Sequence, residues 1–387
     1  MQINRPKILW SLHMFSSLLK VMPILTLGLG VGLEAQSSQK NTKMQPTYRT
    51  ASAVCGVNEG ECCLARSCKC AMGGALEMDF LYWRADNTGF TFAYQQKDPS
   101  STHAYVDNIG SVVRLDSDWA PGFRLGGGWN SDFDRWDVFV DWTWFKDSST
   151  KSRSLDGITS ATDPRGFYPL QSVNDSGTQN RYRDVSASWH LQHNVVDLEL
   201  GRAFYITKAL SLRPHCGLRS GWINQKFKSV FSLPINSAAH QEYDFHGKNN
   251  FSGVGPRVGI HSQWHIDSSS WSILGKASTS LLLGQTKTRY HNKSLTAGAS
   301  SFVTERQLKD NFSQLVPNLQ IFIGLDWGSC LDCEKYYLGI NAGWETNIYW
   351  NQFNIPTAIY TNYAPLPGTG NQAVTMEGLT VNVHFDF

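Results

Sequence analysis

Apolar and polar residues alternate along most of the chain that follows residue 76. The segment 136–144 reads WDVFVDWTW, with tryptophan or valine at every second position. The same period of two recurs over 196–200, 258–266, 319–327 and 336–344. This period places neighbouring side chains on opposite faces of a β-strand, so the chain is predicted to be all-β. A single strand of this kind is equally compatible with a soluble β-sandwich.

The connections between the predicted strands are alternately short and long. Short polar turns cover 130–134, 207–208, 267–270 and 329–333, and long polar segments cover about 148–188, 228–252, 286–314 and 351–377. An outer-membrane barrel has short periplasmic turns and long extracellular loops, whereas a sandwich has no reason for this asymmetry. We count ten strands, and residues 91–115 could add a hairpin. The prediction is a transmembrane antiparallel β-barrel of about 10–12 strands over residues 76–387.

The final ten residues, GLTVNVHFDF, alternate perfectly and end on phenylalanine. Such a strand resembles the signal that the bacterial barrel-assembly machinery recognises, and Phe385 and Phe387 are its predicted residues. Outer-membrane lipid and this machinery are therefore expected partners. Counting back from a periplasmic Phe387 places the short turns, and the segment before the barrel, on the periplasmic side.

Residues 1–35 are typical of a secretory signal peptide. Basic residues precede an apolar run over 21–33, and Ala35 supplies a small residue for cleavage. Met14 is an alternative start, because residues 14–35 alone form a compact signal. An uncleaved anchor is the competing interpretation, which the short run with Pro23 and three glycines argues against. Beyond this segment no run of 18 apolar residues occurs, so no helical span is expected.

All eight cysteines follow the predicted signal peptide, and five of them lie in a predicted periplasmic segment, 36–75. An oxidising compartment favours disulfides, and the candidates are Cys55, Cys62, Cys63, Cys68, Cys70, Cys330 and Cys333. Zinc is the competing interpretation, but Cys-x-Cys is too tight for a zinc ribbon and no matched pair lies at the usual distance. We therefore expect no metal and no cofactor. Five clustered cysteines cannot all pair among themselves, so cross-links to other chains or envelope proteins are a hypothesis.

Composition sharpens this picture. Charged residues make up 17% of the chain, against about 25% for soluble proteins, and aromatic residues make up 12%. The net charge of +2 supplies no basic patch, so nucleic acid is not an expected partner. The mean hydropathy is negative, which excludes a helical membrane protein. It does not exclude a barrel, because alternating polar and apolar positions average out.

If the apolar face meets lipid, the opposite face lines the lumen. Arg or Lys on the lipid face near mid-membrane would cost about 2–4 kcal/mol, so the scarce charges are expected to point inward. The predicted lumen-lining residues are Glu77, Asp79, Arg124, Asp137, Asp141, Asp197, Glu199, Arg213, Arg219, Arg257, Lys276, Asp326 and Glu345. A solvated lumen with both signs of charge would pass small hydrophilic solutes and ions. Alternatively, the charges pair and plug the barrel, since about ten strands enclose little more than side chains.

No enzyme is expected, because neither a Gly-x-Ser-x-Gly nor a His-Glu-x-x-His motif occurs. The pairs His190/His193 and His261/His265 attract attention, but the second pair lies on an alternating strand and is interpreted as polar lumen residues. A hydrolase with its nucleophile on the rim of the barrel is the alternative.

Three strings carry a family resemblance: MDFLYWR at 78–84, PGFRLGGGW at 121–129 and WDVFVDWTWF at 136–145. They resemble the opening strands of the Legionella-type major outer membrane protein family, whose similar pore-forming relatives occur in chlamydia-related bacteria. The resemblance is clearest over 76–147 and is general over the rest of the barrel. It implies a porin in the bacterial outer membrane, assembled as a homo-oligomer or with disulfide-linked envelope proteins. The rival is a structural or adhesive barrel that acts through its long loops and cysteines.

Overall fold

The computed structural model describes residues 73–87, 91–96, 110–131, 136–157, 165–170, 181–207, 209–235, 240–266, 269–296, 300–331, 336–353 and 372–387. The predicted signal peptide and the segment with Cys55, Cys62, Cys63, Cys68 and Cys70 lie outside these residues, as does Cys333. Among the described residues, no helix is long and apolar enough to cross a membrane.

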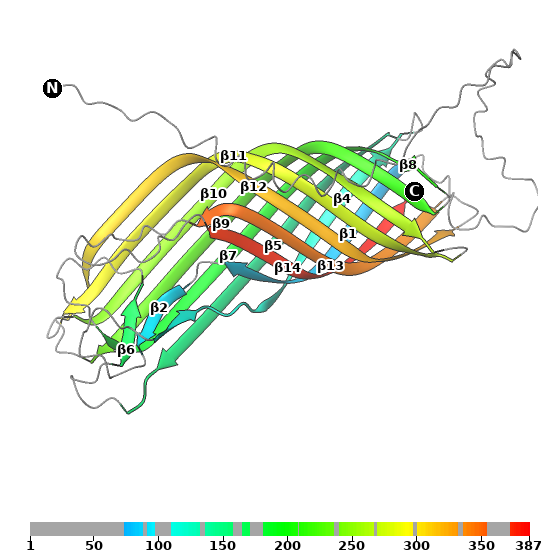
Figure 1. Ribbon diagram of the computed structural model, residues 1–387. Helices are drawn as coiled ribbons and strands as arrows, with labels where there is room; N and C mark the ends of the chain where they lie inside the picture. Colours follow the sequence, from blue (N-terminus) through cyan, green and yellow to red (C-terminus); the bar gives the residue numbers. More distant parts are fainter. Residues whose placement is uncertain are drawn as a thin grey trace, which may run out of the picture. The chain divides into compact units, whose positions relative to one another are not determined.

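The wall of the molecule is a closed ring of ten long antiparallel strands (Figure 1). In order around the ring they are β1 (Gly73–Asn87), β4 (Trp119–Asn130), β5 (Trp136–Ser154), β7 (Tyr182–Arg202), β9 (Leu210–Pro234), β10 (His240–His265), β11 (Trp271–Thr296), β12 (Val303–Leu331), β13 (Tyr336–Phe353) and β14 (Gln372–Asp386). The ring closes because β1 pairs with both β4 and β14. This confirms the predicted antiparallel barrel and excludes the sandwich. The first strand begins at Gly73, three residues before the predicted start.

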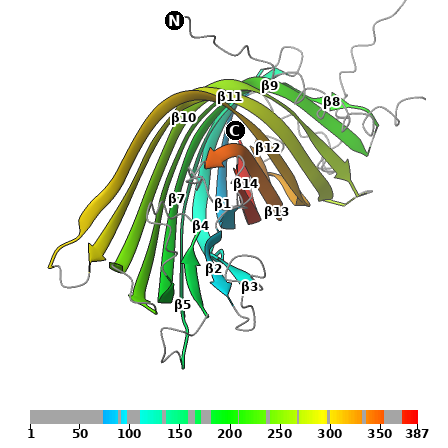
Figure 2. The ribbon, with the colours of Figure 1, turned by 60° about the vertical axis from the view of Figure 1, so that its left-hand side comes forward.

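The hairpin predicted over 91–115 forms but does not enter the wall. Its strands, β2 (Thr91–Gln96) and β3 (Gly110–Arg114), pair with each other, and β2 also pairs with β6 (Gly166–Pro169). Figure 2 shows β2 and β3 near the end of the barrel where β5 and β7 meet their long connections. Strands this short cannot cross a bilayer, which needs about 9–11 residues per strand. The short β8 (Phe204–Tyr205) pairs with β9 at the opposite end.

The barrel has a turn end, where β1 begins and β14 ends, and a loop end. At the turn end, short connections join β4 to β5, β7 to β9, β10 to β11 and β12 to β13. At the loop end, long connections over 88–118, 155–181 and 354–371 join β1 to β4, β5 to β7 and β13 to β14. The predicted alternation of short and long connections holds at these positions.

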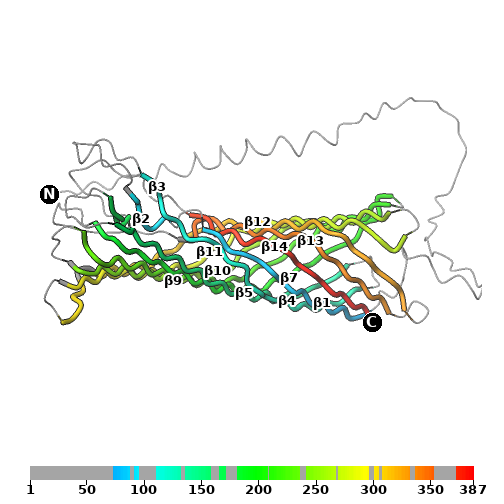
Figure 3. Tube along the Cα trace, turned by 90° about the horizontal axis from the view of Figure 1, so that it is seen from below, coloured from blue at the N-terminus to red at the C-terminus, as the bar shows by residue number. Residues whose placement is uncertain are grey.

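Two of the predicted long loops are instead strand. Residues 228–252 and 286–314 lie largely in β9 to β12, and Figure 3 shows these strands running the length of the barrel. The connections there shrink to 235–239 and 297–302. These segments looked like loops because their outward positions are Lys, Asn and Ser, as expected once a strand leaves lipid. Their inward aromatic residues Phe231, Phe245 and Tyr290 are buried.

The two faces of the wall differ as the alternation predicts. Large apolar side chains such as Leu283, Ile323 and Trp264 are 59–64% exposed on the outer face. Polar and charged residues at the intervening positions point inward, and many of them are buried. At the turn end, the Phe387 amide donates a hydrogen bond to the Gly74 carbonyl, and the Phe385 ring stacks on Tyr336.

The interior is layered along the barrel. On β1, inward Glu77 and Asp79 lie toward the turn end, and inward Leu81 and Trp83 lie toward the loop end. The same order holds on β7, β9, β13 and β14, so charged residues fill one half of the interior. A buried apolar cluster fills the other half. On these strands, the change from inward charged residues to inward apolar residues therefore occurs at a similar position along the barrel axis.

Candidate functional site

The candidate site is the charged half of the lumen. All thirteen predicted lumen residues lie on the inner face of the wall. A cavity with an empty volume of about 1060 Å³ is lined by Glu77, Asp79, Arg124, Asp137, Asp141, Asp197, Glu199, Arg213, Arg257, Lys276 and Glu345. Asp326 lines a second cavity closer to the turn end, and Arg219 is buried against the first cavity's Asp197.

Arg124 of β4 joins three strands. Its Nη1 donates to Asp79 Oδ2 of β1 at 2.6 Å, and its Nη2 donates to Glu345 Oε1 of β13 at 2.7 Å. Its Nε donates to the Thr143 hydroxyl at 3.0 Å. Charge-assisted bonds of this length are the strong class, and they fix Arg124 along the inner wall.

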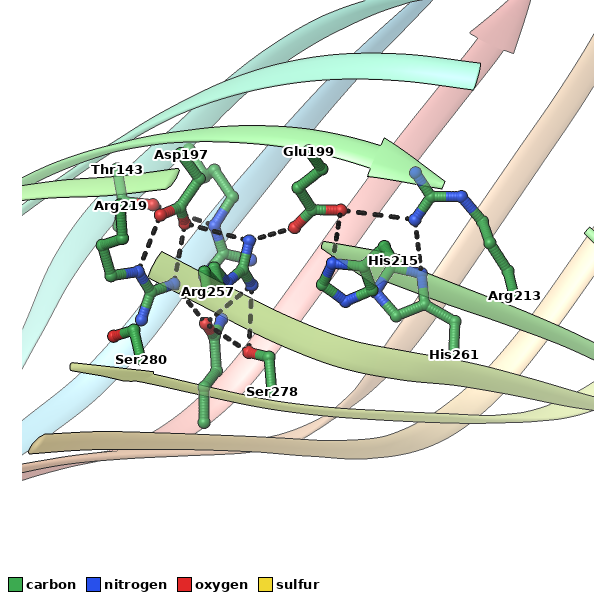
Figure 4. A network of polar contacts seen from close by, with 12 residues as sticks. Thr143, Asp197, Glu199, Arg213, His215, Arg219, Arg257, His261, Ser278 and Ser280 are labelled. Carbon is green, nitrogen blue, oxygen red and sulfur yellow. Dashed lines mark hydrogen bonds and ion pairs between the residues drawn. The ribbon is translucent and has the colours of Figure 1, made fainter. Parts of the chain in front are cut away.

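Arg219 and Arg257 form a second group of guanidiniums around Asp197 (Figure 4). Arg219 of β9 donates from Nε and Nη2 to the two oxygens of Asp197 at 2.7 Å each. Arg257 of β10 pairs with Asp197 at 3.3 Å and with Glu199. Asp197 therefore has a guanidinium on each side, which satisfies a buried carboxylate that would otherwise be costly.

Gln320 of β12 connects the group around Arg124 with the group around Arg219 and Arg257. Its Oε1 accepts from Arg219 Nη2 at 2.6 Å and from Arg257 Nη2 at 3.2 Å, while its Nε2 donates to Glu345 Oε1 at 2.7 Å. A continuous polar network thus runs from β4 through β13 and β12 to β7. It crosses the lumen at the height where the charged half meets the apolar cluster.

Toward the turn end, Arg213 of β9 organises a second cluster. Its guanidinium donates to Asp137 and, at 3.3 Å, to Glu199 Oε2, and its Nη1 lies 3.3 Å from His261 Nδ1. His215 Nδ1 lies 3.4 Å from Glu199 Oε2, and the His215 and His261 rings are 4.8 Å apart.

Among the described residues, Glu199, His215 and His261 are the group that could hold a metal ion, since their ligand atoms lie within 4.8 Å of one another. However, Arg213 and Arg257 both hold the Glu199 carboxylate. A cation would have to displace these guanidiniums, so the cluster fits an ion-pair network better than a metal centre.

Inward glycines make room for this network. A Cβ atom at Gly126 would collide with the Asp141 carboxylate, and one at Gly201 would collide with the Arg213 guanidinium. A Cβ atom at Gly259 would meet the His215 ring. The space beside these glycines is therefore filled by neighbouring charged or imidazole groups.

The second cavity, with an empty volume of about 830 Å³, extends the charged half toward the turn end. Both cavities are lined by Glu77, Arg213, His261, Lys276, Asn341, Asn382 and His384. The Lys276 ammonium lies 5.7 Å from the centre of the Phe322 ring, and no ion pair joins it to a carboxylate of the described residues. The polar interior is thus continuous from the network to the turn end.

A family model for the Legionella pneumophila major outer membrane protein precursor matches residues 71–387, which span the whole barrel. The chain belongs to this family. Membership in the major outer membrane protein family places the protein in the bacterial outer membrane, so the turn end is periplasmic and the loop end is extracellular. The resemblance noted over residues 76–147 therefore extends through the last strand.

No curated protein matches this family member. Among solved structures, it is similar to the Escherichia coli outer membrane protease OmpT, with 6% identity and a TM-score of 0.37, over 82% of this chain and 97% of that chain. It is also similar to a deletion mutant of the monoaromatic hydrocarbon channel TodX (7%, TM-score 0.25, 81% and 91%). A Pseudomonas aeruginosa FadL homologue follows (8%, TM-score 0.21, 81% and 90%).

The extracellular half of the lumen contains residues that the sequence did not point to. Trp83 and Trp189 are fully buried inside, the Trp83 ring packs against Phe145, and Tyr349 contacts His193. In the sequence, these strand segments could be recognised because apolar residues occur on both faces of the strand. Gln320, which connects the network, lies at an inward polar position of the alternating segment 319–327 and could have been found by the same rule.

The described part of this family member contains two cysteines. Cys216 is a free thiol exposed on the outer face of β9. Cys330 lies near the end of β12, and its predicted disulfide stays a prediction. The remaining predicted disulfides fall outside those residues and stay a prediction.

Proposed function

We propose that this protein is a porin, through which small hydrophilic solutes and ions diffuse across the outer membrane. The observation that carries the proposal is the pair of polar cavities with shared lining, which extends a charged interior from mid-barrel to the periplasmic mouth. A purely structural barrel has no need of charge-lined cavities along this half of its interior. Charged groups of both signs along a solvated path are suited to passing hydrophilic solutes.

The lining sets an expected preference for cations. Eight of the thirteen predicted lumen residues are acidic and five are basic. A path lined by an excess of one charge concentrates ions of the opposite sign. We therefore expect cations to permeate more readily than anions.

The network around Gln320 and the apolar cluster beyond it are expected to limit the passage of ions and solutes. Solutes must pass both layers to reach the extracellular side. A small unit conductance is therefore expected, and it would grow when a side chain of either layer is shortened.

The second candidate is a structural or adhesive barrel. The observation in its favour is the buried cluster of Trp83, Phe145, Trp189 and Tyr349, which closes most of the extracellular half. In that case the paired ends of β9 to β12, which extend past the apolar outer band, would be the working surface. Neither candidate is an enzyme, and a barrel-rim hydrolase would be recognised by ester hydrolysis that one Ser substitution abolishes.

Conductance in a planar bilayer separates the two candidates. Refolded protein is first checked for the heat-modifiable gel migration of an intact barrel and then added to one side of the bilayer. Stepwise currents at constant voltage support the porin. Absence of steps from protein that migrates as an intact barrel supports the structural or adhesive candidate.

The proposal includes assembly in the envelope. The five cysteines at 55–70 cannot all pair among themselves, because five is an odd number. This favours cross-links to other chains of this protein or to envelope proteins. Gels of the native envelope with and without reductant test this. Monomer migration that does not change with reductant would contradict it.

A further inference from the structure

Four basic side chains form a row across the outer face of the barrel. In the strand register, Lys226 of β9 lies opposite Lys248 of β10, and Lys248 lies opposite Arg289 of β11. Arg289 in turn lies opposite Lys309 of β12. All four are exposed on the outward face, and exposed His190 of β7 continues the row beside Lys226. We call these four residues the basic row.

The basic row lies just beyond the lipid-facing band. Below it, most outward positions of these strands are apolar up to Val254, Leu283 and Leu315, and Trp222 lies at the upper border. Lys226 is four residues past Trp222, which is about 13 Å along the strand. Strands of such barrels are tilted by about 35–45°, so the height above the tryptophan is about 10 Å. Long basic side chains from this height reach the headgroup layer.

Such a row is unfavourable by itself. Like charges directly opposite each other on neighbouring strands repel, and here three such contacts follow one another. No ion pair joins any of the four to a carboxylate of the described residues. The contrast is Lys228, two residues further along β9, whose ammonium lies 3.6 Å from the Asp244 carboxylate. The described residues thus provide a counter-charge for the next lysine along β9, and none of their carboxylates pairs with the basic row.

We propose that the basic row binds the phosphate groups of a phosphorylated glycolipid in the outer leaflet. Its acyl chains would lie along the apolar band below, and its phosphates would supply the missing counter-charge to Lys248 and Arg289. A soluble phosphate compound fits less well, because the row lies on the outer wall directly above the lipid-facing surface. The proposal does not rest on porin function, since a closed barrel would carry the same row.

The test is native mass spectrometry of the full barrel in detergent, titrated with bis-phosphorylated lipid A. The double variant Lys248→Gln/Arg289→Gln should bind at least tenfold more weakly than the parent. The matched control, Arg114→Gln/Arg153→Gln, removes two exposed charges outside the row and should bind like the parent. Dephosphorylated lipid A should bind the parent at least tenfold more weakly than the phosphorylated form.

Thermal unfolding in lipid-free detergent accompanies the titration. The double variant should unfold at the same temperature as the parent or higher, because repulsion within the row is relieved. Weak binding together with this retained stability supports the proposal. Equal binding by the two double variants, equal binding of dephosphorylated lipid A, or full competition by inorganic phosphate at the same concentration would each overturn it.

Discussion

Glu199 lies between two guanidiniums and a histidine ring in the lumen. Arg213 and Arg257 pair with its oxygens, and His215 lies within 3.4 Å. The side chain is almost completely buried, so its charge depends on these partners for stabilisation. The two cationic side chains depend on Glu199 in the same way.

Replacing Glu199 by Gln keeps the shape of the side chain and removes its charge. Because one partner of a buried ion-pair network is lost, the free energy of unfolding is expected to fall by about 3–5 kcal/mol. Urea titration of the barrel in lipid vesicles measures this change. The control Glu377→Gln breaks the exposed pair with Arg84 and should cost at most about 1 kcal/mol. Equal losses in the two variants would contradict the account.

At the residue scale, the sequence predicts which face of the wall a side chain lies on better than it predicts which residues pair with each other. Alternation placed all thirteen charged residues inside, because a one-residue shift in register would turn them to lipid. It could not pair Arg124 with Glu345 or Arg219 with Asp197, because those contacts depend on which strands become neighbours and how far each side chain reaches. The sequence likewise does not show what fills the space beside Gly126 and Gly201. That space is taken by Asp141 and Arg213, which lie on the adjacent strands.

The strands β9 to β12 are the elements that differ most from expectation. Their extracellular ends were predicted as loops because these segments are long and polar. Outside lipid the outward positions become Lys, Asn and His, while inward Phe231 and Tyr243 still pack together. Strand pairing continues because the inner face still has a core to cover.

A histidine pair in this extension makes its stability depend on pH. The rings of His246 and His291 stack at 4.6 Å on neighbouring strands, one register step beyond the basic row and outside the membrane. Burial lowers the pKa of His291, and the charges of His246 and Lys293 lower it further. The unfolded chain therefore binds the proton more readily, so this stability is fully present above about pH 6.5 and is lost as the pH falls from there toward the lower pKa of the folded protein.

The variant His246→Gln removes one of these charges, so the pKa of His291 should rise toward its ordinary value. Titration of the His291 ring by NMR measures the shift. His190→Gln, on the outward face of β7, serves as the control and should leave the His291 titration unchanged. An unchanged pKa in His246→Gln would mean that the stacked pair is not electrostatically coupled.

At the scale of the whole molecule, three zones are stacked from the periplasmic mouth outward. Cavities lined by charge come first, then the network around Gln320, and then the apolar cluster. The sequence predicted the barrel, its closure and the inward charge, and the family match confirms the location in the outer membrane. The filled extracellular half was not predicted, because an inward aromatic residue and a lipid-facing one look alike in a sequence.

The central claim is that ions cross the membrane through this charged lumen. The most direct test is the reversal potential across a planar bilayer in a KCl gradient, because contaminating pores would not respond to a lumen substitution. Lys276 points into both cavities and Lys287 is exposed on the outer face of the same strand. Lys276→Glu should shift the reversal potential toward greater cation selectivity, and Lys287→Glu should match the parent. Channels whose selectivity is the same in all three proteins would contradict the account.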